Sequence, residues 1–304
     1  MSLPITETIA QLAISAYPLL SSRLVELSNL GSAELGILEQ AWADIEPERR
    51  RQIISRLVEL AEDNIELNFD NIFTYGLRDQ DAEIRCRAIE GLWENEEPVL
   101  ITPLLNLLGN DSSQKVQAAA ATSLGRFALL AEHDILRSCH KVKISQALLG
   151  VIDDHSKGLE IRRRALESVS SLNLPQVSTA IKKAYQNGNF KLRVSAIYAM
   201  GKNYEVTWLP LLLKELTSSD AEIRYEAAVA CGELGENEAV PSLIKLVADS
   251  DTDVRLAAIR ALGGIGGNPA KGTLEGCRNT SNEAVRQAAE QALDELEVWE
   301  HLCH

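Results

Sequence analysis

Aromatic residues are scarce in this sequence, and long apolar runs are missing. Phenylalanine, tryptophan and tyrosine make up 5% of the 304 residues, although hydrophobic residues reach 45%. No stretch approaches the roughly 20 consecutive apolar residues that a transmembrane helix needs. The first residues also lack the basic and apolar regions of a secretory signal. We therefore expect a cytoplasmic protein without a membrane partner, whose core consists of helices packed through aliphatic side chains.

Paired cysteines and metal-ligand spacings are missing too. The five cysteines lie singly, at Cys86, Cys139, Cys231, Cys277 and Cys303, and no C-x-x-C motif occurs. This pattern indicates reduced thiols rather than disulfides. Histidine and cysteine gather in two places, at His133, Cys139 and His140 and, near the end of the chain, at His301, Cys303 and His304. Neither group has the ligand spacing of a closed zinc site, so we expect no metal and no cofactor.

The sequence has fewer basic than acidic residues, and it lacks the sequence motifs of common enzymes. The net charge of −14 excludes a nucleic-acid partner, because affinity for phosphate backbones comes largely from lysine and arginine. No G-x-S-x-G motif occurs, and the glycine-rich run 263–267 lacks the Lys-Ser/Thr ending of a phosphate loop. We assign no catalytic residue and favour a protein without enzymatic activity.

One short phrase, by contrast, returns seven times. Its first copy reads Asp81-x-x-Ile84-Arg85-x-x-Ala88-Ile89, and its arginine position is filled in order by Arg85, Gln117, Arg162, Arg193, Arg224, Arg255 and Arg286. The last five copies are spaced 31 residues apart. A fixed period of this size is typical of an array whose units are too small to bury their own apolar faces, so that neighbours stack.

Each unit is predicted to be a helical hairpin. Counted from the arginine, offsets −1, +3, +4 and +7 are mostly apolar and fall on one face of a helix. Offset +3 is always alanine: Ala88, Ala120, Ala165, Ala196, Ala227, Ala258 and Ala289. Prolines such as Pro210 and Pro241 mark the start of a preceding first helix. Glycines at +8 (Gly201, Gly232, Gly263) and just beyond (Gly235, Gly266) are predicted to end the second helix.

Departures from the period set the predicted domain layout. Fourteen residues are inserted between Gln117 and Arg162, near residues 131–143, and the last copy carries Glu290 and Asp294 in core columns, as a capping unit does. Residues 1–65 are predicted to form an N-terminal helical region with a degenerate capping repeat. Residues 66–297 form the repeat array, and 298–304 a tail. The predicted fold is all-α: an α-α superhelix of about seven stacked hairpins with an N-terminal helical cap.

The phrase D-x-x-[IV]-R-x-x-A-[AI]-x-[AG]-L-G resembles a HEAT repeat, and the 31-residue length is similar to the short HEAT-like repeats of phycobilisome lyases. The resemblance covers about residues 66–297. It implies that first helices line a convex side, second helices line a concave side, and the phrase Asp and Arg form a ladder between repeats. In this sequence, the ladder that the resemblance implies comprises Asp81, Arg85, Arg162, Arg193, Asp220, Arg224, Asp251, Arg255 and Arg286. Gln117 departs from the pattern and should weaken the ladder locally.

Two kinds of HEAT-like enzyme bear on the function. The metal-dependent deoxyhypusine hydroxylases use repeated His-Glu motifs, and this sequence has no His-Glu dipeptide. A bilin-lyase-like or chromophore-handling enzyme remains the alternative function. Its tetrapyrrole would need cationic partners for its propionates, which Arg163, Arg164 and Arg193 can supply. The other interpretation of these arginines is that they are solvated charges on a helix.

The candidate partner-binding surface lies on the predicted second helices. Offsets +1 and +5 should face solvent, and three adjacent copies place apolar residues there: Val194, Tyr198, Tyr225, Val229 and Leu256, with Glu226, Arg260 and Arg164 at the rim. Exposed apolar area with tyrosines and charged edges is typical of a protein-binding groove. The alternative is that offset +1 is partly buried between neighbouring second helices. The predicted function is a non-catalytic scaffold or adaptor that presents this surface to a protein partner.

Overall fold

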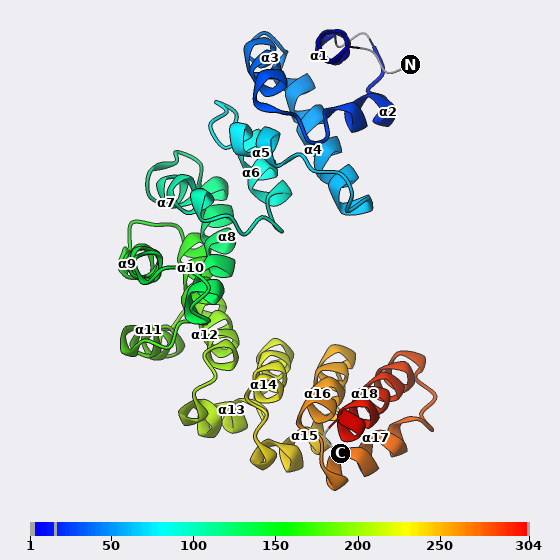
Figure 1. The fold of residues 1–304 in the computed structure, drawn as a ribbon. Coiled ribbons are helices and arrows are strands. Elements are labelled where there is room, and N and C mark those ends of the chain that lie inside the picture. The colour runs from blue at the N-terminus through cyan, green and yellow to red at the C-terminus, as the bar shows by residue number, and fades with distance from the viewer. Residues whose placement is uncertain (1–3, 15–16, 303–304) are drawn as a thin grey trace. The chain divides into compact units, whose positions relative to one another are not determined.

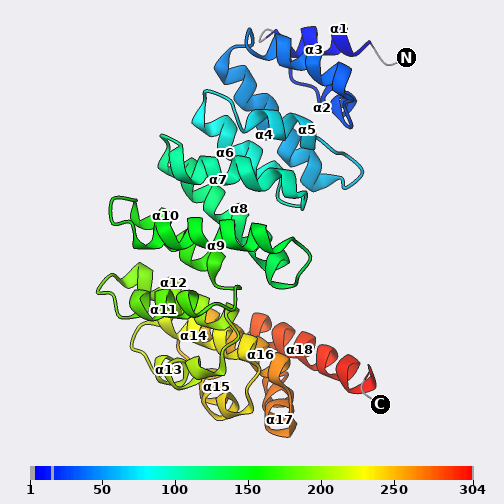
Figure 2. The same ribbon diagram turned by 60° about the vertical axis from the view of Figure 1, so that its left-hand side comes forward.

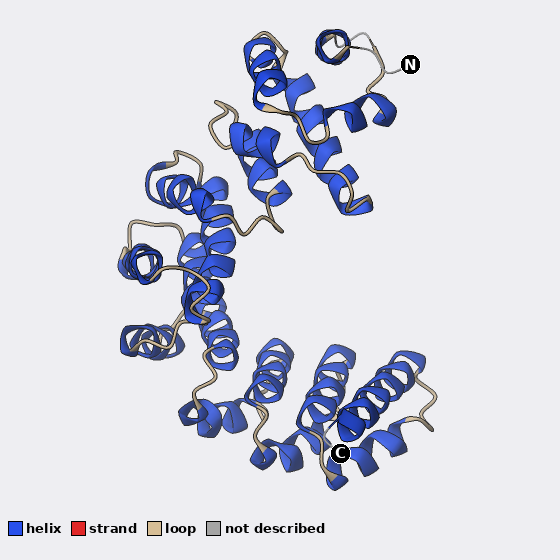
Figure 3. Ribbon diagram, in the orientation of Figure 1, coloured by secondary structure: helices blue, strands red, loops and turns tan. Residues whose placement is uncertain are grey.

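The computed structural model describes residues 4–14 and 17–302, with side chains as far as Val298. Every regular element in these residues is a helix (Figures 1 and 3), as the sequence predicted. The chain divides into two compact units, residues 1–168 and 169–304. None of the described helices is long and apolar enough to cross a membrane.

The first unit contains the N-terminal helices and the first repeats. Its helices are α1 (Ile5–Ala13), α2 (Ser21–Leu24), α3 (Ser32–Trp42), α4 (Pro47–Asp63), α5 (Asp70–Gly76), α6 (Ala82–Gly91), α7 (Ile101–Asn110), α8 (Gln114–Glu132), α9 (Ser138–Asp153) and α10 (Leu159–Val169), whose last residue crosses the boundary. Helices α4, α6 and α8 pack in succession as one layer, and α5 and α7 pack against α6 and α8 as a second layer.

The second unit repeats the same two-layer arrangement more regularly. Its helices are α11 (Pro175–Tyr185), α12 (Phe190–Lys202), α13 (Leu209–Glu215), α14 (Ala221–Leu234), α15 (Val240–Leu246), α16 (Thr252–Ile265), α17 (Asn268–Cys277) and α18 (Glu283–Leu302). The second helices α12, α14, α16 and α18 pack side by side (Figure 2), and each first helix packs against the second helix that follows it.

Local sequence explains where each helix starts. The Asp81 carboxylate accepts hydrogen bonds from the backbone N–H groups of Glu83 and Ile84, and Asp251 caps α16 in the same way. These bonds satisfy N–H groups that have no partner inside the helix. Pro210 and Pro241 stand at the second residue of α13 and α15, where a missing N–H costs nothing. All seven column alanines are fully buried, which confirms the predicted core face.

The glycines at offset +8 have a different role from the predicted one. Gly201, Gly232 and Gly263 lie inside α12, α14 and α16, which continue past them. A Cβ on Gly232 would stand 2.9 Å from Ala261 Cα, and one on Gly201 would stand 2.7 Å from Ala230 Cα. These glycines therefore let neighbouring second helices approach closely. Gly235 (φ 71°) and Gly266 (φ 76°) end α14 and α16 as expected.

The extra residues between Gln117 and Arg162 lengthen two helices. Helix α8 has 19 residues and α9 has 16, whereas their counterparts α14 and α15 have 14 and 7. The turn between α8 and α9 includes Asp134, whose φ is 57°. The insertion thus extends the hairpin lengthwise. Helix α8 still packs closely on α10, since a Cβ on Gly125 would stand 3.2 Å from Ser168 Cα.

Candidate functional site

Several of the repeated arginines tie a hairpin to the next one. Arg85 donates from Nε and Nη2 to the two carboxylate oxygens of Asp111, at 2.7 and 2.8 Å, and from Nη1 to the carbonyl of Asp79 at 2.7 Å. Arg224 repeats this geometry with Asp249, at 2.8 Å for both bonds. The two-pronged contact matches the planar guanidinium to the carboxylate. These arginines hold repeats together and are not a free anion site.

Two of the three carboxylates that the resemblance implied, Asp220 and Asp251, do not bridge repeats. Asp220 and Asp251 accept hydrogen bonds from backbone N–H groups of their own helices, so they cap rather than bridge. The bridging carboxylates stand two residues before the cap, in the loop that the previous arginine reaches: Asp79, Asp111 and Asp249. Only the loop conformation decides which of two neighbouring acids faces the preceding repeat, and the phrase does not encode it.

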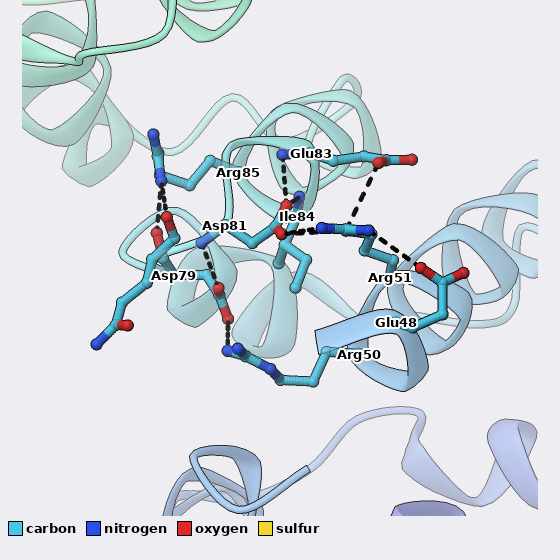
Figure 4. Close-up of polar contacts among 9 residues, drawn as sticks. Glu48, Arg50, Arg51, Asp79, Asp81, Glu83, Ile84 and Arg85 are labelled. Atoms are coloured by element: carbon cyan, nitrogen blue, oxygen red, sulfur yellow. Dashed lines mark hydrogen bonds and ion pairs between the residues drawn. The ribbon is translucent and has the colours of Figure 1, made fainter. Parts of the chain in front are cut away.

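At the N-terminal end of the array, Asp81 performs both tasks (Figure 4). It caps α6 and also accepts from Arg51 Nη2 at 2.6 Å, which lowers the pKa of this carboxyl. Its neighbour Asp79 accepts from Arg50 Nη1 at 2.6 Å and from the backbone N–H of Asp81 at 2.8 Å. The ladder therefore extends upstream into α4.

Four other members of the predicted ladder vary the pattern. Arg193 Nη2 binds the buried Glu215 at 2.7 Å, and the Tyr185 hydroxyl shares that carboxylate. Arg162 Nε donates to the Ile152 carbonyl at 2.9 Å, and Arg255 Nη2 donates to the Thr252 hydroxyl at 2.6 Å. Among the described residues, the guanidinium of Arg286 has no hydrogen-bond or ion-pair partner.

Gln117 does not leave a gap in the ladder. Its amide donates to the Asp111 carbonyl, and its Oε1 accepts from Lys157 Nζ at 3.0 Å. Lys157 also donates to the Gly109 carbonyl at 3.1 Å. A lysine from the loop before α10 thus provides the cation at this position, while the neutral glutamine connects the two repeats.

The predicted partner-binding residues are only partly accessible. Val194 is 4% exposed and cannot contact a partner, because a short side chain at offset +1 stays within the helix packing. Tyr198, Tyr225, Glu226, Val229 and Leu256 are half-buried, and Arg260 is exposed. Longer side chains at the same flank reach beyond the packing and keep part of their surface in water. The alternative interpretation of offset +1 therefore holds for Val194.

Tyr225, Leu256 and Arg260 border an open groove on α14 and α16. This groove, named here the Tyr225 groove, measures about 520 Å³ and is lined by Ala221, Glu222, Tyr225, Asp251, Asp253, Leu256 and Arg260. A second depression of similar size continues along Tyr225, Val229, Ala257 and Arg260. Three carboxylates against one arginine give the Tyr225 groove a negative rim around an apolar centre.

A comparable groove in the first unit was not predicted. It measures about 700 Å³ between α6 and α8 and is lined by Cys86, Ile89, Glu90, Trp93, Ala118, Ala119, Thr122, Ser123, Arg126 and Arg164. We name it the Trp93 groove. Trp93 stands at offset +8, where four other copies carry glycine, and this exchange was the signal in the sequence. Arg164, expected at the rim of the other groove, lies here.

The arginines considered for a chromophore are already paired with acids. Arg163 Nη1 lies 2.8 Å from Glu160, and Arg164 contacts Glu160 and Glu167 at 2.8 and 2.9 Å. Arg193 binds Glu215. Among the described residues, no three His, Cys, Asp or Glu side chains are placed to share a metal ion, His133, Cys139 and His140 included. The tail group of His301, Cys303 and His304 falls outside the described side chains.

Comparison with known proteins supports the repeat architecture. A model of HEAT repeats matches residues 72–143 and 209–294, just over half of the chain. The complex of CpcE and CpcF of phycocyanin lyase from Nostoc sp. PCC7120 is 16% identical with a TM-score of 0.51, covering 97% of this chain and 96% of that one.

Two further solved structures match the chain with lower TM-scores. A designed armadillo repeat protein is 21% identical over 64% of this chain and 99% of its own, with a TM-score of 0.41. Human deoxyhypusine hydroxylase is 20% identical, with coverages of 97% and 96% and a TM-score of 0.32. No curated protein matches the sequence. Together with the stacked hairpins and their arginine ladder, the matched repeats show that the chain belongs to the HEAT-repeat family.

Proposed function

We propose that the protein is a non-catalytic adaptor that holds a protein partner on the second helices of its second unit. The observation that carries this proposal is the Tyr225 groove, where Tyr225 and Leu256 keep part of their apolar surface in water between two packed helices. Tyrosine and large aliphatic side chains in such positions supply much of the binding energy in protein interfaces. Stacked repeats form extended surfaces suited to this task.

The charge around the groove defines the partner's chemistry. Glu222 and Asp253 are exposed at the first turns of α14 and α16, and Asp251, which caps α16, also lines the groove. Arg260 is the cation among the lining residues. A segment that places an apolar side chain on Tyr225 and Leu256, with lysine or arginine beside it, would complement this rim.

The experiment compares charge insertion at the groove with charge insertion elsewhere. Leu256→Glu and Tyr225→Glu should leave helicity and the melting temperature nearly unchanged, because each side chain is half-buried and a charged group there can reach solvent. Both variants should abolish capture of a partner from the native host. Val206→Glu is the matched control, since Val206 is 52% exposed and lies outside the groove. A large drop in melting temperature for the groove variants, or equal loss of capture in the control, would contradict the proposal.

The same purified protein separates this function from chromophore handling. We expect no visible absorbance after the protein is mixed with a linear tetrapyrrole and passed through a gel-filtration column. The reason is that Arg163, Arg164 and Arg193 are held by glutamates and are not available for propionates. A retained absorbance band would favour the enzyme instead.

A further inference from the structure

We propose that the Trp93 groove is a second docking site, which takes a protein segment carrying a bulky apolar side chain next to an aspartate or glutamate. The inference concerns a different unit and different residues from the proposed adaptor surface, and it stands without that surface. Three observations lead to it: the apolar floor of the groove, the exposure of Trp93, and one arginine without an acidic partner.

The floor of the groove is made of small side chains. Ala118 and Ala119 on α8 face Ile89 on α6, and the space between the two helices amounts to about 700 Å³. In the second unit, the columns that Cys86 and Ala118 occupy are filled by Tyr225 and Leu256. The partner must therefore bring the large side chain, because the protein provides only the depression.

Trp93 lines this groove, and most of its side chain is exposed to water. Its side chain is 58% exposed, whereas Trp42 and Trp208 are 2% and 6% exposed and donate their indole N–H groups to Asp79 and Asn203. Leaving a large aromatic surface in water forgoes favourable burial. An exposed tryptophan beside an apolar depression is a common anchor of protein interfaces.

Arg126 gives the groove a positive charge that no carboxylate contacts directly. Its Nη2 donates to the carbonyls of Leu92 and Asn95, at 3.1 and 2.6 Å, and these bonds fix the guanidinium at the C-terminal end of α6. Among the described residues no carboxylate forms an ion pair with it. Burial lowers its pKa, and the more distant charges of Glu96 and Asp70 offset this only in part. The other charges at the rim are neutralised, because Arg164 pairs with Glu160 and Glu167 and Glu90 pairs with Arg87.

An acidic occupant follows from this charge balance, and a protein segment follows from the shape. A carboxylate near Arg126 gains from a cation that is partly shielded from water. The groove is open rather than enclosed, so a small molecule would keep much of its surface in solvent, unlike ligands in typical pockets. A peptide that lies along α6 and α8 can place one apolar side chain between them and continue on both sides.

The test selects peptides on the full-length protein carrying Leu256→Glu, so that the Tyr225 groove cannot contribute binders of its own. A phage-displayed library of random peptides of about 12 residues is the probe, and enriched peptides are synthesised with fluorescein for anisotropy titrations. We expect enriched sequences to pair a bulky apolar residue with Asp or Glu. Trp93→Ala should weaken their binding at least about tenfold, as loss of an aromatic anchor does. Replacing the peptide's acid by its amide should weaken binding as well.

A matched pair of substitutions at one position isolates the effect of side-chain charge on peptide affinity. Ala118 is half-buried on a helix, so Ala118→Glu and Ala118→Lys add side chains of similar length without disturbing the core. Ala118→Glu should weaken acidic peptides about tenfold more than Ala118→Lys does. Melting temperatures measured for both variants check folding, and Val206→Glu, outside both grooves, should leave peptide affinity unchanged.

Several results would overturn the proposal. They are an absence of enriched peptides, enriched peptides without an acid, or binding that tolerates both Trp93→Ala and Ala118→Glu. Binding of the small apolar anion 1-anilinonaphthalene-8-sulfonate that is lost in Trp93→Ala, with no peptide enriched, would assign the groove to small molecules instead. Self-association in sedimentation experiments that disappears in Trp93→Ala would assign it to a second copy of this chain.

Discussion

At the scale of single residues, two-pronged arginine–aspartate pairs connect neighbouring repeats. The side chains of Arg224 and Asp249 are 13% and 8% exposed, so the pair is largely shielded from water. Arg224 Nη1 also donates to the Ser218 carbonyl at 2.8 Å. The guanidinium thus satisfies one loop of its own repeat and one of the next. Removing either partner leaves a shielded charge without its counter-ion.

The first prediction concerns this pair. Arg224→Ala and Asp249→Ala should each lower the free energy of unfolding by about 2–4 kcal/mol, and the double variant should lose less than their sum. Urea titration followed by circular dichroism measures the three values. Glu59→Ala removes half of an exposed pair, Arg56–Glu59, and should change stability by less than about 1 kcal/mol. Additive losses at residues 224 and 249 would show that the two side chains act independently.

The second prediction concerns the stability of the protein at acid pH. Arg224 holds the pKa of the Asp249 carboxyl below its usual range, so the unfolded chain takes up this proton before the folded one does. The stabilisation is therefore complete above the ordinary aspartate pKa of about 4 and fades as pH falls through the lower folded value. Thermal melts from neutral pH to below pH 4 should show Asp249→Asn losing its disadvantage against the parent protein. A constant difference across this range would exclude the linkage.

At the scale of elements, glycine decides how close second helices come. Gly232 lies within α14, and a Cβ there would stand 2.9 Å from Ala261 Cα and 3.0 Å from Ala261 Cβ on α16. Because a backbone atom is one of these neighbours, a side-chain rotation cannot relieve the contact. The spacing of the helices would have to change, and the arginine ladder of the same repeats would shift with it.

The third prediction compares two glycines in helices. Gly232→Ala should destabilise the protein by about 1–3 kcal/mol, as overpacking does. Gly272→Ala, in α17, meets no atom within 4 Å and should stabilise by about 0.5–1 kcal/mol through helix propensity. Chemical denaturation of both variants measures whether each substitution raises or lowers the free energy of unfolding. Stabilisation by both would mean that α14 and α16 adjust freely to a methyl group.

At the scale of the whole molecule, stability accumulates from contacts between neighbouring hairpins. Within the second unit, α16 packs on α14 on one side and on α18 on the other. The last repeat carries Glu290 and Asp294 in columns that hold no charged residue in the other copies, so its outer face is suited to water. Terminal units of repeat arrays need such a polar face.

The fourth prediction tests this capping role. Removal of residues 282–304 exposes the side of α16 that carries Gly263, which should lower the urea midpoint and increase binding of 1-anilinonaphthalene-8-sulfonate. Glu290→Ala and Asp294→Ala within the intact chain are the controls and should shift the midpoint little. An unchanged midpoint in the truncated chain would show that α18 does not support α16.

Much of the candidate site was predictable, but its accessible surface was not. The columns placed Tyr225, Val229 and Leu256 on one face of adjacent second helices, and the structure brings Tyr225 and Leu256 into one groove. Val194 obeys the same pattern and is buried, because side-chain reach relative to the neighbouring helix determines exposure. The Trp93 groove escaped prediction because its floor consists of alanines, which in a column resemble core residues.

The sequence alone determined the helical hairpins, their register and their buried face, because period, caps and apolar spacing act within a few residues of the chain. The tertiary structure decided which acid binds each arginine, why Gly201, Gly232 and Gly263 are glycine, and where grooves remain open. These properties depend on distances between atoms of different repeats. Such distances arise only when hairpins stack, and a difference of two positions within a loop separates a capping aspartate from a bridging one.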